Sequence, residues 1–289
     1  DLRMSRGLGD VYKRQEMNYN PTLDSLVIGS DEVFNCIQKN SNVGYSTELF
    51  GKDNHADRVI TYAASFGNTT LEKLEKYQKA NEIGNLLKKF DAISVRDANS
   101  GSIVEQLTGE EPVYNLDPVL TYDYMNCCNR IPQIKATEKY LILYAYAGRI
   151  SNDEADWIAE YAKRKNLKVY AIGGIQKCAD RFIDCSPFEV LAYFRNAEEI
   201  ITDTFHGSIF SVITHRRFTT LIRKSVGNSY GNEEKLSDLL NRLVLTERMT
   251  TKVEDAKRIN QEPVNYEKVD ELLKAHREIA KNYLRENLL

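Results

Sequence analysis

One segment combines an acid and a histidine in a pattern typical of a ligand site. The apolar run Ile200 to Thr202 leads into Asp203, and His206-Gly207 follows directly before a second apolar pattern. This order is typical of a buried strand that ends in a tight turn and opens a helix. Because ligands of open α/β sheets bind at the carboxyl ends of strands, we expect Asp203 and His206 to face a cleft.

Imidazole titrates near neutral pH, so His206 is the first candidate for the acid or base of a proton transfer. It is equally a candidate donor to a phosphate or carboxylate, whereas a histidine that caps or packs under the helix is the structural alternative. We expect Asp203 to hold the loop or to orient His206. Arg223 follows the next strand and is a candidate anion ligand, with a solvated surface pair as the alternative.

The first half of the chain offers a second set of candidates. Arg96 directly follows a short strand, so its guanidinium is expected to reach the cleft unless an acid such as Asp97 pairs with it. Asp31 is expected to orient a cation, to bind a sugar hydroxyl or to cap the next helix. Ser65 and Gly67 would offer backbone N–H groups to an anion, although Gly67 also suits a turn with positive φ.

Composition excludes several function classes. The chain has 289 residues, 42% hydrophobic and 28% charged, with a formal net charge of −3, which gives no reason to expect nucleic acid as a partner. No apolar run approaches the roughly 20 residues of a transmembrane helix. Five cysteines without a CxxC pair argue against disulfides and a zinc ribbon. We expect a cytoplasmic protein, at most peripheral at the inner membrane face, without a metal or cofactor.

Strands and helices alternate twice along the chain, which predicts two doubly wound parallel sheets and an α/β fold class. The expected strands cover residues 26–31, 59–67, 92–96, 113–118, 140–147, 167–172, 200–203 and 218–222. The expected helices cover residues 70–90, 101–107, 153–165, 187–196, 208–214, 236–243 and 266–284.

These elements predict an N-terminal Rossmann-like domain over 16–125, a linker over 126–137, a C-terminal Rossmann-like domain over 138–265 and a final helix over 266–289. Residues 1–15 lack any period and resemble translated adapter sequence, so we expect a non-native or disordered leader. Few residues then precede the first strand, and we expect the first sheet to be truncated.

Five motifs, in the same order, resemble those of the polysaccharide pyruvyl transferase family. They are Gly29-Ser30-Asp31-Glu32-Val33-Phe34-Asn35, Tyr62-Ala63-Ala64-Ser65-Phe66-Gly67, Ser94-Val95-Arg96-Asp97 with Ser100-Gly101, Leu116-Asp117-Pro118-Val119-Leu120 and Asp203-Thr204-Phe205-His206-Gly207. The resemblance implies a GT-B-like fold, with two Rossmann-like domains and a cleft between them. It also implies that the enolpyruvyl unit of phosphoenolpyruvate is transferred to a sugar of a surface polysaccharide, giving a pyruvate ketal.

We assign each candidate a role in this reaction. His206, Asp31 and Asp203 are the expected catalytic residues, and the expected substrate-binding residues are Arg96, Ser65, Gly67, Gly207, Arg223 and Lys235. Lys235 stands where many relatives have Arg, so it would neutralise a phosphate without a bidentate contact. The partners implied are phosphoenolpyruvate and a saccharide acceptor, either free or lipid-linked; the oligomeric state is open.

Two other functions fit the same elements. A GT-B-type glycosyltransferase would use a sugar nucleotide, and its thermal stability would respond to that ligand rather than to phosphoenolpyruvate. A non-catalytic saccharide-binding protein would suit an incomplete first domain.

Overall fold

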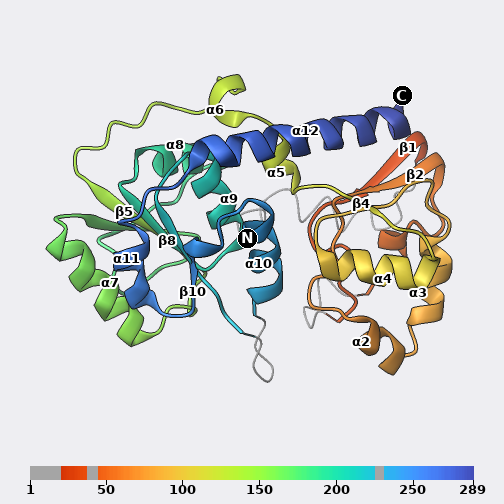
Figure 1. Ribbon diagram of the computed structural model, residues 1–289, viewed down its shortest axis with the longest axis horizontal. Helices are drawn as coiled ribbons and strands as arrows, with labels where there is room; N and C mark the ends of the chain where they lie inside the picture. Colours follow the sequence, from red (N-terminus) through yellow and green to blue (C-terminus); the bar gives the residue numbers. More distant parts are fainter. Residues whose placement is uncertain (1–20, 38–44, 225–230) are drawn as a thin grey trace. The chain divides into compact units, whose positions relative to one another are not determined.

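The computed structural model describes residues 21–37, 45–224 and 231–289 (Figure 1). The leader expected over residues 1–15 lies outside them. The chain divides into two units, residues 1–117 with 281–289, and residues 118–280. The division falls at Asp117, ahead of the boundary expected at residue 125. The last residues of helix α12 (Tyr266–Leu288) belong to the first unit rather than to a separate element.

The first unit contains short parallel strand pairs. Strand β1 (Thr22–Gly29) pairs with β2 (His55–Tyr62), and β3 (Ser94–Val95) pairs with β4 (Val113–Tyr114). Isolated parallel bridges join Ile60 to Ala92 and Ala64 to Val95, so β3 continues the arrangement next to β2. Parallel neighbours require crossover segments, and the crossover between β3 and β4 is helix α4 (Ala98–Thr108).

Aromatic side chains form the centre of the first unit's core. The rings of Phe34 and Phe50 stack at 4.5 Å, and Phe66 lies 5.2 Å from Phe34. Helices α2 (Leu71–Lys76) and α3 (Ala80–Leu87) bury their apolar faces against this group, together with the 3-10 helix Thr47–Phe50. A single helix over 70–90 was expected, and that expectation is wrong. Gln78 adopts φ 56° and ends the first helix, since this conformation cannot continue an α-helix.

The second unit contains a six-stranded parallel sheet in the order β10-β9-β8-β5-β6-β7. Its strands are β5 (Tyr140–Tyr144), β6 (Lys168–Ile172), β7 (Arg181–Phe182), β8 (Glu199–Thr202), β9 (Phe218–Leu221) and β10 (Met249–Thr250). The strand order reverses at β5, which lies between β6 and β8. Such a switch point opens a crevice at the carboxyl ends of the strands, where α/β proteins bind ligands.

Helices cover both faces of this sheet, as Figure 1 shows. On one face, α7 (Asn152–Arg164) and α11 (Ala256–Ile259) pack on Leu141 and Leu143. On the other face, rings from α8 (Pro187–Asn196) and α9 (Phe205–Ile213) contact Tyr144, with Phe194 at 5.9 Å and Phe210 at 6.1 Å. The remaining helices of the unit are α5 (Pro118–Thr121), α6 (Tyr124–Cys127), α10 (Glu233–Arg242) and most of α12, with 3-10 turns at Thr246–Arg248 and Val253–Asp255.

The two-residue strands β7 and β10 were not expected, because two residues carry no recognisable period. Among the described residues, no helix combines the length and apolar composition of a membrane span.

Candidate functional site

Asp203 follows β8 at the carboxyl edge of the second unit's sheet. Its side chain is 0% exposed, and neither carboxylate oxygen accepts a hydrogen bond from a described residue. The backbone, in contrast, is well held: the carbonyl accepts from Asn232 Nδ2 at 2.6 Å, and the N–H donates to the Tyr144 carbonyl at 3.4 Å. A buried carboxylate without hydrogen bonds is rare in folded proteins and commonly marks a functional position.

Two arginines lie beside this carboxylate without bonding to it. Arg149 Nη1 is 3.7 Å and Arg223 Nε is 4.0 Å from Asp203 Oδ2, beyond hydrogen-bond length. Burial raises the pKa of Asp203, the two arginines oppose that rise, and Glu154 adds to it, so that the pKa lies above its usual range. Asp203 is therefore a buried acid whose negative charge the two neighbouring arginines only partly neutralise.

The Arg223 guanidinium is held in place by a hydrogen bond from one of its nitrogens. Nη1 donates to Glu154 Oε1 at 2.7 Å, and the backbone N–H donates to Asn232 Oδ1 at 2.6 Å. Nε and Nη2 are buried and donate to no described residue. These two nitrogens form the edge with which arginine binds a carboxylate or phosphate in bidentate fashion. The side chain that was expected to meet an anion thus presents a suitable edge.

Glu154 holds Arg223 while it also caps helix α7. Its Oε2 accepts from the Ser151 N–H at 2.9 Å, and Ser151 Oγ accepts from the Glu154 N–H at 3.2 Å, which is a capping box. Although burial raises its pKa, the bonds from Arg223 and the Ser151 backbone are together stronger and lower the pKa of Glu154. The sequence carried the capping signal but no sign of the distant arginine.

Asn232 connects the carboxyl ends of two strands. Besides its bond to the Asp203 carbonyl, Nδ2 donates to the Leu221 carbonyl at 3.2 Å, and the Asn232 N–H donates to the Arg223 carbonyl at 2.9 Å. This side chain is 2% exposed and immediately precedes α10. Lys235, a predicted phosphate ligand, lies in the first turn of α10 and is half-buried.

His206 lies in the first turn of α9 and is half-buried. Its ring is 5.7 Å from that of Phe205 and 6.0 Å from that of Phe210. Asp203 was expected to orient His206, but the Asp203 carboxylate makes no hydrogen bond to it. The two residues share one strand end and do not form an acid–histidine pair in this structure.

Gly207 has a packing role in the same turn. Its N–H donates to Thr204 Oγ1 at 2.9 Å, which caps α9. A Cβ atom on Gly207 would lie 2.1 Å from Thr202 Oγ1 and 2.7 Å from Tyr144 Cδ1. The position is closed to any side chain, and the N–H already has an acceptor.

In the first unit, Arg96 bridges two carboxylates instead of pointing freely into solvent. Nη1 donates to Asp117 Oδ2 and Nη2 to Asp31 Oδ1, each at 3.1 Å. The side chains of Arg96 and Asp117 are 3% and 2% exposed, whereas that of Asp31 is 79% exposed. Asp31 adopts φ 50° and is followed by turns, so it caps no helix. Arg96 therefore links the exposed carboxylate of Asp31 to the buried carboxylate of Asp117.

Ser65 and Gly67 are engaged within the first unit. Ser65 Oγ donates to Asp97 Oδ2 at 2.6 Å and accepts from the Gly67 N–H at 3.0 Å, and the Phe66 N–H donates to Ser100 Oγ at 2.8 Å. The Gly67 N–H, which was expected to hold an anion, thus has a protein acceptor. Asp97 itself caps α4 by accepting from the Ser100 N–H.

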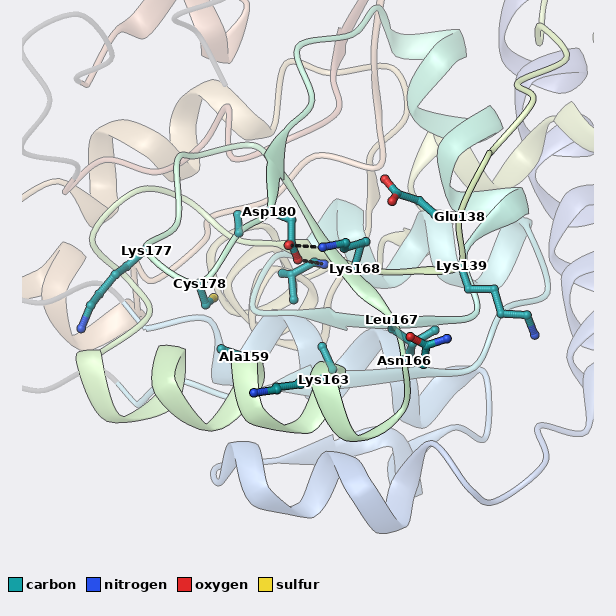
Figure 2. Close-up of a pocket in the computed structure, with 13 residues that line it drawn as sticks. Glu138, Lys139, Ala159, Lys163, Asn166, Leu167, Lys168, Lys177, Cys178 and Asp180 are labelled. Carbon is teal, nitrogen blue, oxygen red and sulfur yellow. Dashed lines mark hydrogen bonds and ion pairs between the residues drawn. The ribbon is translucent and has the colours of Figure 1, made fainter.

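A cavity of about 720 Å³ lies elsewhere on the second unit (Figure 2). It is lined by α7 and by residues at the amino ends of β5 and β6, where Lys168 Nζ and the Val169 N–H both donate to Asp180 at 2.9 Å. Lys177 is similarly paired, with Asp156 at 3.3 Å. We place the candidate site at the opposite, carboxyl edge, because the unsatisfied carboxylate of Asp203 and the unsatisfied guanidinium edge of Arg223 lie there. Within the described part of the chain, no group of three or more His, Cys, Asp or Glu side chains is arranged for a metal ion.

Comparison with protein families shows to which family the chain belongs. Residues 9–225 match the family model described as polysaccharide pyruvyl transferase. The chain belongs to the polysaccharide pyruvyl transferase family. The resemblance read from the five motifs is thereby confirmed. A search of curated proteins found no match.

A solved structure that aligns over nearly the whole chain gives this pyruvyl transferase family member a GT-B-like α/β fold. A Listeria monocytogenes protein assigned as a UDP-N-acetylglucosamine 2-epimerase aligns with a TM-score of 0.50 at 10% identity, covering 98% of this chain and 77% of that one. A Neisseria meningitidis UDP-GlcNAc 2-epimerase bound to UDP-GlcNAc aligns with a TM-score of 0.48 at 9% identity, covering 79% and 69%. The wall teichoic acid polymerase TagF aligns with a TM-score of 0.35 at 10% identity, covering 95% and 84%.

The pyruvyl transferase motifs of the first unit are linked to one another by hydrogen bonds. Ser65 of the second motif bonds to Asp97 of the third, and Arg96 of the third bonds to Asp117 of the fourth. Arg96 also bonds to Asp31 of the first motif. Segments that are separate in sequence therefore form one polar network.

Proposed function

We propose that the chain transfers the enolpyruvyl unit of phosphoenolpyruvate to a saccharide, forming a pyruvate ketal. Family membership supports the class of reaction. The observation that carries the donor assignment is the buried edge of Arg223, whose Nε and Nη2 donate to no described residue and which lies at the same end of the sheet as His206. A phosphate or carboxylate oxygen pair fits that edge.

The reaction requires two protons to be supplied and two to be removed. An acid protonates the methylene carbon of phosphoenolpyruvate, which leaves an oxocarbenium-like centre. One sugar hydroxyl attacks this centre and loses its proton, inorganic phosphate leaves with a proton on the oxygen that was bonded to carbon, and a second hydroxyl closes the ketal and loses its proton. His206 is the proposed proton donor and acceptor, since imidazole exchanges protons near neutral pH.

The other candidates take supporting roles in this proposal. Arg223 and Lys235 stabilise the donor's negative charge. The exposed carboxylate of Asp31 accepts a hydrogen bond from a sugar hydroxyl, and Arg96 positions it. Gly207, Ser65 and Gly67 support the local backbone, because their groups already have internal partners.

The test follows phosphate release and ketal formation by the purified chain with phosphoenolpyruvate and a panel of mono- and disaccharides. Phosphoenolpyruvate-dependent ketal formation is expected, and it should be lost in His206→Ala. His55→Ala, which changes an exposed histidine at the start of β2, is the matched control and should retain activity.

Full activity in His206→Ala would remove His206 from the mechanism. A folded wild-type sample that responds to a sugar nucleotide and ignores phosphoenolpyruvate would overturn the proposed donor.

A further inference from the structure

We propose that Arg149 and Arg223 together form the anion-binding pair of the second unit, and that Asp203 is their resting counter-ion, displaced when a small phosphate or carboxylate ligand binds. The inference rests on the proposed function for the identity of the natural ligand. It adds Arg149, which no sequence motif contains, and it gives Asp203 a role other than orienting the histidine.

The first argument is the geometry around Asp203. Its Oδ2 lies 3.7 Å from Arg149 Nη1 and 4.0 Å from Arg223 Nε. A settled arginine–carboxylate pair would show bonds of about 2.7–2.9 Å. The cations are therefore attracted to Asp203 but not bonded to it, and a ligand oxygen with better geometry can replace the carboxylate without breaking a hydrogen bond.

The second argument is the concentration of unsatisfied polar atoms. Both oxygens of Asp203 and two nitrogens of Arg223 are buried and form no hydrogen bond within the described part of the chain. Each such group costs free energy unless a ligand or water satisfies it. A bound anion would satisfy the Arg223 nitrogens directly.

The third argument is access. The side chains of Arg149 and Arg223 are 30% and 25% exposed, so part of each borders solvent, whereas Asp203 and the Nε and Nη2 atoms of Arg223 are buried. The Arg149 guanidinium lies 5.1 Å above the Tyr146 ring, which limits its freedom while leaving its donors available. Both arginines follow the carboxyl ends of strands, β5 and β9, on either side of β8.

Displacement has a consequence for protons. The charged groups that face Asp203 are Arg149 from the segment after β5, Arg223 from the segment after β9, and Glu154 from α7. Asn232, ahead of α10, contributes only an uncharged amide. When the two cations turn to a ligand, burial and Glu154 remain, both of which raise the pKa of Asp203. Asp203 should then take up a proton from solvent as the anion binds.

Calorimetric titration of the full chain with phosphoenolpyruvate, and separately with inorganic phosphate, tests the anion-binding pair. Arg149→Gln and Arg223→Gln should each weaken binding of both probes about 10- to 100-fold. Arg223→Lys should also weaken it, because an ammonium lacks the bidentate edge. Arg164→Gln removes an exposed arginine of α7 and should change nothing. Unchanged binding in folded Arg149→Gln would overturn the inference.

Proton uptake is measured on the wild-type chain, so it does not depend on a variant that folds. Titrations at pH 7.5 in Pipes and in Tris, whose ionisation enthalpies differ, should show net proton uptake as phosphoenolpyruvate binds. Affinity should then fall as the pH rises, because binding is coupled to proton uptake. Asp203→Asn should abolish both effects. Absence of proton uptake in the wild type would overturn the counter-ion role.

The results separate the inference from the proposed function. Ketal formation with normal binding by Arg149→Gln would leave the function standing and remove the anion-binding pair. Loss of phosphate binding in both arginine variants, in a chain that forms no ketal, would leave the pair standing and remove the function.

Discussion

Arg223 Nη1 donates to Glu154 Oε1 at 2.7 Å, so the capping carboxylate of α7 determines which edge of the guanidinium faces a ligand. Removal of that charge should both free the Arg223 side chain and weaken the cap of helix α7. We therefore expect Glu154→Gln to lower the free energy of unfolding at pH 7 by about 1 to 3 kcal/mol. Urea titration at pH 7 measures this loss.

The pH dependence of the Glu154 effect has a definite sign. Because the folded state lowers the pKa of Glu154, its contribution is complete above the usual value of 4.5 and is lost as pH falls through the lowered pKa. The difference between Glu154→Gln and wild type should shrink below pH 4.5. Glu160→Gln, on the exposed side of the same helix, is the control. An equal loss of stability in Glu154→Gln and Glu160→Gln would show that the Glu154–Arg223 contact contributes no more than an exposed ion pair.

Gly207→Ala should destabilise the chain by about 1 to 3 kcal/mol. The new Cβ would lie 2.1 Å from Thr202 Oγ1, and that hydroxyl cannot easily move, since it donates to the Tyr144 carbonyl and accepts from the Thr204 N–H. Thermal unfolding of the variant measures the effect. Gly84→Ala in helix α3 should cost much less, because the atom nearest to the new Cβ, the Leu107 carbonyl oxygen, would be 3.3 Å away. A Gly207→Ala variant as stable as wild type would contradict the close packing.

Arg96→Gln should unfold more easily than wild type by about 3 to 5 kcal/mol, because it leaves the carboxylate of Asp117 buried without its cation. Arg96 was expected to reach the cleft unless an acid paired with it, and the structure pairs it with Asp117 and Asp31. Asp31→Asn should leave stability within about 1 kcal/mol, since that side chain is exposed. Chemical denaturation of both variants checks the contrast; equal stability of Arg96→Gln and wild type would restore the simpler ligand role.

Asn232→Asp keeps an oxygen for the Arg223 N–H but loses the donor to the Asp203 and Leu221 carbonyls. It also places a second acid beside Asp203. We expect lower stability together with weaker phosphoenolpyruvate binding, measured by calorimetry on the folded sample. Asn241→Asp, on the exposed side of α10, is the control. Normal binding by Asn232→Asp would mean that the strand ends keep their geometry without this side chain.

The fold class was predictable because alternating strands and helices leave a local record in the sequence. The same is true of Asp203 and His206, whose place after a buried strand follows from a short apolar run. The roles of Arg149 and Asn232 could not be predicted from a local pattern, because each residue meets Asp203 from a segment that is distant in sequence.

Two further differences between expectation and structure have physical reasons. A pattern of apolar residues could not reveal the left-handed residue Gln78 that divides α2 from α3. Nor could it reveal that Ser65 would accept the Gly67 N–H, which turned an expected anion nest into an internal bond.

The unsatisfied atoms around Asp203 place stability and activity in opposition. A buried acid without hydrogen bonds is a position where an uncharged side chain could make the folded chain more robust. A selection for thermostable variants that ignores catalysis should therefore change Asp203 early, and the survivors should bind an anion without the proton uptake that accompanies binding in the wild type. Selection for activity would act in the opposite direction and would preserve this weak point in the fold.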